Sequence, residues 1–214
     1  MESFSPELRS GLAERELLQS VVAVARHVYG AAASSVFMVS PDTGELVFAA
    51  VAGAGEQALV GMRFQPGTGI AGWVAASGQP LIADNVHETD TFALDAASST
   101  GYLPGSIMAA PLIADGECIG VLEVLDRHAA PSGEAGRDLD DIHLLGLLAT
   151  QAALSLSLLR RSDRGDSYSP RMGSLLARLS EHAAMDSHDP LAVALLGVSL
   201  DLLERVAQAA SLPA

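Results

Sequence analysis

The sequence predicts an α+β domain in which helices flank an antiparallel sheet of about six strands, followed by a C-terminal helical extension. The β-rich residues 35–40 and 45–51 lie on either side of a proline-to-glycine turn and predict one hairpin. Residues 106–114 and 117–125 predict a second hairpin, because they flank Asp115-Gly116, a pair that tight turns favour. Hairpins at both ends of a domain indicate antiparallel strands rather than a doubly wound parallel sheet.

The first predicted helix begins at Ser5-Pro6-Glu7, where a capping hydroxyl, a proline and an acid are all typical of a first turn. It ends near Tyr29. The apolar side chains of residues 17–28 occupy more than the single stripe that covers one sheet. Residues 142–159 show the same excess, so we expect a homodimer through these terminal helices, or their packing against the C-terminal tail.

The segment between the two hairpins begins with a glycine turn and a short helix. Residues 66–69 form the turn and residues 70–76 the helix. A brief strand, residues 81–83, then ends at Asp84-Asn85. We expect Trp73, on the short helix, to be a core side chain.

A polar, turn-rich excursion from residue 86 to residue 105 separates that strand from the second hairpin. Long excursions from a sheet are commonly binding loops or lids. After the hairpin, residues 137–160 predict a long closing helix, residues 161–170 a polar linker and residues 171–214 a tail of two helices. The closing helix is long enough to span a membrane, but its histidine, glutamine and serines indicate a buried or interfacial helix instead.

The composition argues against several kinds of partner and chemistry. The 26 acidic and 12 basic residues give a net charge of −14, which argues against nucleic acid and anionic membranes as partners. The chain has no lysine, so it cannot use a phosphate-loop or Schiff-base lysine. A single cysteine permits no internal disulfide, and the N-terminus does not resemble a signal peptide, so we expect a cytoplasmic protein.

Four short motifs, in this order and spacing, resemble the GAF family of small sensory domains. They are the helix Gly-Ile-Ala-Gly-Trp-Val-Ala, Gly-Gln-Pro-Leu before Asp84-Asn85, Ala-Pro-Leu-Ile at residues 110–113 and Ile-Gly-Val-Leu-Glu-Val at residues 119–124. The resemblance covers residues from about 17 to about 160 and leaves the ligand and any cofactor unnamed. It implies a non-enzymatic sensory or regulatory module, in which a small molecule biases the terminal helices and thereby a dimer or a protein partner.

The resemblance also implies a ligand pocket under the segment 84–106. We expect side chains of that segment and of the strands beside it to line the pocket. The candidates are Phe37, Asp84, Phe92, Asp95, Tyr102, Ser106 and Met108. Glu123 is a further candidate, because alternation puts it on the same side of its strand as Val121 and Leu125. There the carboxylate must find a backbone or arginine donor, contact a ligand or accept a raised pKa.

Three other interpretations compete with this one. Residues 67–72 match a dinucleotide fingerprint, but Pro66 rather than an apolar strand precedes them, so a close-packed turn explains the glycines better. Cys118 has no adjacent histidine, so we expect an inert thiol; methionine sulfoxide reductases of the GAF fold use several cysteines. His182 and Asp186 have a metal-compatible spacing, but on an acidic helix such a pair is usually solvated.

Two ligand classes of the family stay open as alternatives. Cyclic-nucleotide-binding members carry Asn-Lys after the last strand, then Phe and Asp-Glu near the closing helix. The matching positions here hold Asp126-Arg127, Arg137 and Asp140-Asp141, and residues 92–102 resemble the lid helix of the same domains. His87 could be an axial haem ligand, because some members use a histidine from this region.

We therefore predict a sensory domain at residues 17–160, with residues 1–16 as the N-terminal part of its first helix. It would bind a small molecule and signal through helical dimer or partner contacts. A dimeric interaction scaffold with a filled, ligand-free pocket is the main alternative. An enzyme is disfavoured, because the sequence shows no nucleophile–base pair, no carboxylate pair at a sensible spacing and no strong metal motif.

Overall fold

The computed structural model describes residues 6–53, 59–86, 102–127 and 135–163. The chain divides into two compact units, Leu12–Leu154 on the one hand and Met1–Gly11 with Ser155–Ala214 on the other. Nearly all described residues belong to the first unit, which contains the whole sheet. The predicted helices of the tail, within residues 171–214, lie outside the described residues.

A six-stranded antiparallel sheet forms the centre of the unit Leu12–Leu154, in the order β3-β2-β1-β6-β5-β4. Every neighbouring pair is antiparallel. The strands are β1 (Ala33–Val39), β2 (Leu46–Gly53), β3 (Arg63–Phe64), β4 (Leu81–Asp84), β5 (Ser106–Ala114) and β6 (Glu117–Leu125). The predicted fold class is therefore confirmed, including both hairpins, which are β1–β2 and β5–β6.

Both hairpin turns use the backbone that their sequences predict. Asp115 and Gly116 have φ values of 52° and 88°, and a tight two-residue hairpin turn requires positive φ at both central residues. In the β1–β2 turn, Gly44 has a φ of 71° and donates its N–H to Ser40 O, while Ser40 N–H donates to Glu45 O. These turns bring the strands of each hairpin into register.

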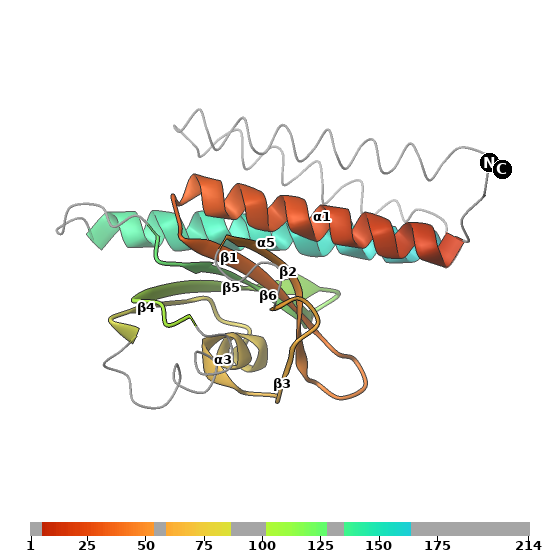
Figure 1. Ribbon diagram of the computed structural model, residues 1–214, viewed down its shortest axis with the longest axis horizontal. Helices are drawn as coiled ribbons and strands as arrows, with labels where there is room; N and C mark the ends of the chain where they lie inside the picture. The colour runs from red at the N-terminus through yellow and green to blue at the C-terminus, as the bar shows by residue number, and fades with distance from the viewer. Residues whose placement is uncertain (1–5, 54–58, 87–101, 128–134, 164–214) are drawn as a thin grey trace. The chain divides into compact units, whose positions relative to one another are not determined.

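Helices lie on both faces of this sheet (Figure 1). Helices α1 (Pro6–Val28) and α5 (Ala135–Asp163) lie on one face, and α3 (Gly69–Ser77) lies on the other. Buried side chains recur every three or four residues along both long helices: Leu18, Val22 and Ala25 on α1, and Leu145, Ala149 and Ala152 on α5. This spacing is one stripe of a helix surface, so each helix covers the sheet with one side.

The segment Asp138–Arg161 of α5 has the length and mean hydropathy, 1.7, of a membrane-spanning helix, and half of it is buried within the protein. A core helix of a globular domain has the same length and composition. The buried stripe over the sheet agrees with the prediction of a buried or interfacial helix.

The glycines before α3 allow a close backbone contact. A Cβ on Gly72 would lie 2.4 Å from the carbonyl carbon of Gly67, a residue with a φ of 79°. The two-residue strand β3, at one edge of the sheet, precedes this turn, and β4, at the other edge, follows α3. No parallel strand–helix–strand crossover exists among the described strands, so the close-packed turn is confirmed and the dinucleotide fingerprint is not.

The prediction that Trp73 is a core residue is wrong, because 38% of its surface is exposed. Successive residues of a helix are rotated by about 100°, so Ile70, Ala71 and Val74 share one side of α3. These three are the side chains buried against the sheet. Trp73 lies well outside that stripe and points away from the sheet.

Strand alternation divides the buried side chains of the sheet between its two faces. Phe37, Ile107 and Val121 belong to the core on the α3 face, together with Ile70 and Val74 of α3. On that face, three phenylalanine rings of β1, β2 and β3 pack together: Phe37, Phe48 and Phe64. The centroids of the first two rings are 4.1 Å apart.

We expect Gly72→Ala to lower the free energy of unfolding by about 1–3 kcal/mol, because the added Cβ forces the Gly67 backbone away from α3. Gly146→Ala in α5 is the matched control, since a Cβ there meets nothing within 4 Å and alanine favours a helix. Urea unfolding of both variants measures the difference. Equal stability of the Gly72→Ala variant and the unchanged protein would show that the close contact is absent.

Candidate functional site

One rung of the sheet brings two polar side chains into the core of the α3 face. In the strand ladders, Glu123 of β6 lies directly opposite Ser35 of β1 on one side and Ala109 of β5 on the other. Val51 of β2 pairs with Ser35, and Leu81 of β4 pairs with Ala109, so these five paired residues form one row across the sheet, which we call the rung. Val51 and Ala109 belong to the core on the α3 face, so the Glu123 and Ser35 side chains point toward α3.

The Glu123 carboxylate is buried without a counter-charge. Only 7% of the residue is exposed, and burial raises its pKa to about 7. The nearby Ser35 hydroxyl opposes this rise. Of the outcomes expected for a carboxylate in an apolar strand, burial without an ion partner among the described residues favours the raised pKa.

The Ser35 hydroxyl is the second unusual group of this rung. Ser35 is 3% exposed, and its Oγ makes no hydrogen bond with any described residue. It lies close enough to the Glu123 carboxylate to lower the pKa of that group, against the larger effect of burial. The two groups are therefore neighbours on the α3 face, and the Ser35 hydroxyl has unused hydrogen-bonding capacity.

A second polar cluster closes the end of the sheet, around Asp126. Its Oδ1 accepts hydrogen bonds from the backbone N–H groups of Gly105 and Ser106 over 2.7 and 3.0 Å. Its Oδ2 accepts a short hydrogen bond from the Tyr102 hydroxyl, which raises the pKa of that phenol to about 12, with burial adding to the effect. Asp126 adopts a φ of 49°, an uncommon angle for a residue other than glycine. These contacts hold residues 102–106 to the end of β6.

The next residue, Arg127, connects this end of the sheet with α5. Its guanidinium lies 2.5 Å from both Asp138 and Asp141. Partial burial lowers the pKa of Arg127, but the two carboxylates raise it more. The backbone carbonyl of Asp141 also accepts a hydrogen bond from the Tyr29 hydroxyl over 2.9 Å, and burial raises the pKa of that phenol well above its usual range. Residues 126–127 thus link the sheet end, α5 and the segment after α1.

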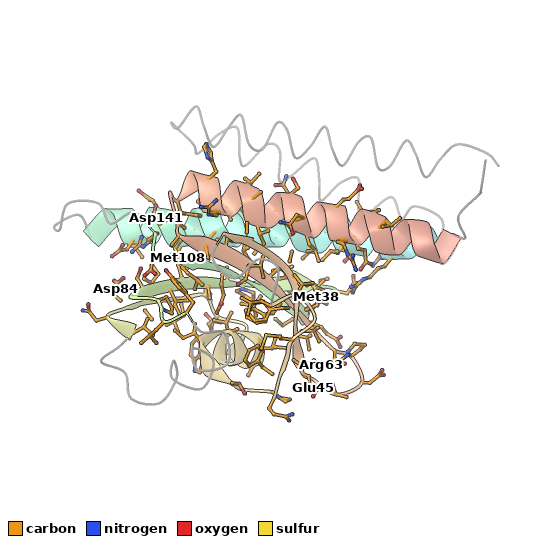
Figure 2. All side chains as sticks on the ribbon, in the orientation of Figure 1. Met38, Glu45, Arg63, Asp84, Met108 and Asp141 are labelled. Carbon is orange, nitrogen blue, oxygen red and sulfur yellow. The ribbon has the colours of Figure 1, made fainter. Side chains whose placement is uncertain are left out.

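The structure brings together three of the candidate residues predicted from the sequence. Asp84, at the exposed end of β4, pairs in the ladder with Ser106, and Tyr102 is held to the same strand ends through Asp126. Figure 2 shows Asp84 and Asp141 toward one end of the sheet and the ion pair of Glu45 with Arg63 toward the other.

Two other candidates lie elsewhere. Phe37 is buried within the phenylalanine cluster. Met108 is buried on the opposite face, because its neighbours in β5, Ile107 and Ala109, both belong to the α3 face. Phe92, Asp95 and the possible ligands His87, His182 and Asp186 lie outside the described residues.

The described part of the chain offers no catalytic thiol or metal cluster. Cys118 of β6 is half-buried, its Sγ donates to Gly120 O over 3.1 Å, and burial raises its pKa, which disfavours the thiolate. Within the described ranges, no group of three or more histidine, cysteine and acidic side chains could hold a metal ion.

A groove of about 570 Å³ lies between the C-terminal part of α1 and the end of β2, away from the rung. Arg26 and His27 are among the residues that line it. Both belong to the last turn of α1, where cations offset the helix dipole, and Arg26 Nε already donates to Ala32 O. None of the candidates predicted from the sequence lines this groove.

The family model that matches this chain is described as GAF domain and covers residues 14–156. A 104-residue segment is 32% identical to the probable 3',5'-cyclic phosphodiesterase pde-5 of Caenorhabditis elegans. That segment is 48% of this chain and spans only 14% of the length of the relative.

Solved structures share the fold. A free methionine-R-sulfoxide reductase from Neisseria meningitidis, in complex with its substrate, is 26% identical, with a TM-score of 0.56 over 70% of this chain and 81% of that chain. The GAF domain of a phosphoenolpyruvate-protein phosphotransferase from Coxiella burnetii is 20% identical, with a TM-score of 0.59 over 71% of this chain and 86% of that chain. At 20% identity, the second likeness shows the fold alone.

We expect Glu123→Gln to change how stability depends on pH. The ordinary pKa of the carboxyl group is 4.5, and its pKa in the folded protein is about 7. At a pH between these two values, the folded protein holds a proton at Glu123 that the unfolded chain releases. This contribution is present at low pH and is lost as pH rises through 7, and the difference between the two pKa values corresponds to about 3 kcal/mol. Glutamine does not titrate, so the variant should gain about 3 kcal/mol relative to the unchanged protein from pH 4 to pH 8.

Urea unfolding across this pH range measures that difference. Glu117→Gln, on the exposed end of the same strand, removes the same charge and should show no such trend. A stability difference for Glu123→Gln that is constant with pH would show that the carboxyl group is not shifted.

Proposed function

Because this chain belongs to the GAF domain family, we propose that it is a non-enzymatic sensory or regulatory domain that binds a small molecule beside Glu123. The observation that carries the proposal is the buried Ser35 hydroxyl, whose Oγ has no hydrogen-bond partner among the described residues, directly opposite the buried acid Glu123. Nearly all buried polar groups in proteins are hydrogen-bonded, and each exception needs an explanation. A bound molecule that supplies the missing bonds is such an explanation.

The cost of leaving the buried Ser35 hydroxyl unsatisfied supports a ligand. A buried polar group without a partner costs about 1–3 kcal/mol, and a charged group costs more. Both neighbours of Glu123 on the same rung, Ser35 and Ala109, have small side chains. A ligand would recover this energy on binding, and the protein would be more stable with its ligand than without it.

The position of the excursion supports a pocket between residues 84 and 106, as expected for the family. Val86 N–H donates to Gly105 O over 3.0 Å, so the chain leaves and re-enters the sheet at one place. The return is held by Asp126, which lies three residues after Glu123, just past the end of β6. A molecule that contacts both the rung and the excursion would change how residues 102–106 are held.

We propose that the signal leaves through Asp126 and Arg127. Asp126 accepts a hydrogen bond from Gly105, where the chain returns to the sheet, and Arg127 binds Asp138 and Asp141 of α5. A displacement of Asp126 must be accommodated by Arg127, because the two residues share a peptide bond. The terminal helices would transmit it to a second copy of the chain or to a protein partner. Leu139 of α5, with 70% of its surface exposed, is an apolar group available for such a contact.

The absence of enzymatic activity is part of the proposal. The single cysteine has a raised pKa and no histidine beside it in sequence, which does not suit a nucleophile. Together with the acidic charge of the chain and its lack of lysine, this supports a cytoplasmic binding module rather than a catalyst or a nucleic-acid-binding protein.

A dimeric scaffold without a ligand is the second candidate function. The packed rings of Phe37, Phe48 and Phe64 favour it, because they fill the β1–β3 part of the α3 face with protein side chains. Cyclic-nucleotide binding is a further alternative, supported by the similarity to the probable phosphodiesterase. Haem binding would depend on His87, outside the described residues.

Native mass spectrometry of the protein purified from its own host tests the proposal directly. We expect a dimer with excess mass that is lost on denaturation, because a ligand that fills the Glu123 rung should survive purification. Glu123→Gln should lose this mass and Glu117→Gln should keep it. A bare dimer would favour the scaffold, and a bare monomer would contradict both candidate functions.

A further inference from the structure

We propose that the ligand of this domain is an organic cation, a protonated amine with an apolar remainder, whose N–H groups bind Glu123 and Ser35 together. The inference rests on the proposed function and adds the chemical class of the ligand. It follows from three properties of the α3 face: its single charge, the arrangement of its two polar groups and the apolar character of the rest.

The first property is that Glu123 is surrounded by uncharged elements. Strands β1, β2 and β5 and helix α3 contain no charged residue. Strand β4 has one, Asp84, which is exposed at the strand end. The described arginines nearest in sequence to the sheet are already engaged, Arg63 with Glu45 and Arg127 with α5. A counter-charge for Glu123 must therefore come from outside the described residues.

This property argues against an anionic ligand. A carboxylate or phosphate next to Glu123 would have to approach a buried acid with no cation on the surrounding strands or helix to offset the repulsion. An ammonium ion instead stabilises the ionised carboxylate, and it is the partner with which buried charges are normally compensated. The charge pattern thus selects a cation.

The second property is the arrangement of acceptors. Residues directly opposite on neighbouring antiparallel strands have Cβ atoms about 5 Å apart, so the Glu123 carboxylate and the Ser35 hydroxyl can be reached by one small group. An ammonium group carries three N–H donors and no acceptor. It can donate to the carboxylate and to the free Ser35 oxygen at once, which satisfies both groups. A quaternary ammonium ion has the charge but lacks the N–H donors.

The third property is the surface around the pair. The side chains that share the α3 face with Glu123 are apolar, and they include Val51, Val74, Leu81 and Val121 as well as the ring of Phe37. None offers a hydrogen bond to a second polar group of a ligand. The remainder of the molecule should therefore be a short hydrocarbon rather than a sugar or a zwitterion.

Isothermal titration of the full chain at pH 8 with n-hexylamine tests this assignment, with 1-hexanol, hexanoate and hexyltrimethylammonium as matched probes. We expect saturable binding of hexylamine and at least about tenfold weaker binding of the other three, because each lacks either the positive charge or the N–H donors. Glu123→Gln should weaken hexylamine binding by at least about tenfold and Ser35→Ala by about fivefold. Glu117→Gln, which removes an exposed charge from β6, should leave it unchanged and so controls for attraction to an acidic protein.

Several outcomes would overturn the inference. If hexanoate or hexyltrimethylammonium bound as tightly as hexylamine, recognition of charged N–H donors would be excluded. It would also be excluded if the Glu123→Gln variant bound hexylamine as tightly as the unchanged protein, or if no straight-chain amine of four to eight carbons showed saturable binding. If the excess mass retained from the host is a neutral or anionic compound whose binding needs Glu123, the sensory function stands and only the ligand class is wrong. If the unchanged protein shows neither amine binding nor retained mass, the function itself is contradicted.

Discussion

The position of β6 between β1 and β5 is the constraint on which the rest of this domain depends. The Ser34 hydroxyl donates to the Glu123 carbonyl over 2.8 Å, and a Cβ on Gly120 would lie 2.4 Å from Phe37 O, so β6 fits closely against β1. A slip of one residue would exchange the two faces of the strand and send its apolar side chains to the wrong side. With β6 in register, the Glu123 side chain faces α3, and Asp126-Arg127 follows at the point where the excursion, the sheet and α5 meet. The same register therefore determines the core and the site.

Most of the fold could be predicted from local sequence. Asp115-Gly116 specified a hairpin because its backbone angles suit few other connections, and the α1 start followed from a proline that needs no N–H partner. Trp73 shows where such reasoning fails. Its size favoured the core, but α3 is short and buries only one side, so the rotation of the helix decided the outcome. Residue type gave the wrong answer there, and geometry gave the right one.

The candidate site was only partly accessible from the sequence. Alternation placed Glu123 on the apolar face of β6, and the same rule applied to β1 would have identified Ser35 as its neighbour once β1 and β6 were known to pair. That pairing joins residues almost ninety positions apart, so no local signal reveals it. The bond between Tyr102 and Asp126 is long-range in the same sense. Met108 was selected for its nearness to the excursion, but alternation with Ala109 turns it toward α1 and α5.

The central claim is that Glu123 is an uncompensated buried acid until a ligand arrives. The most direct test is a ¹³C NMR titration of its side-chain carboxyl group, assigned by comparison with Glu123→Gln, in the protein freed of ligand by unfolding and refolding. The account predicts a midpoint at about 7. A midpoint near the ordinary value of 4.5 would show that the protein itself compensates the charge, and the case for a ligand at this rung would fail.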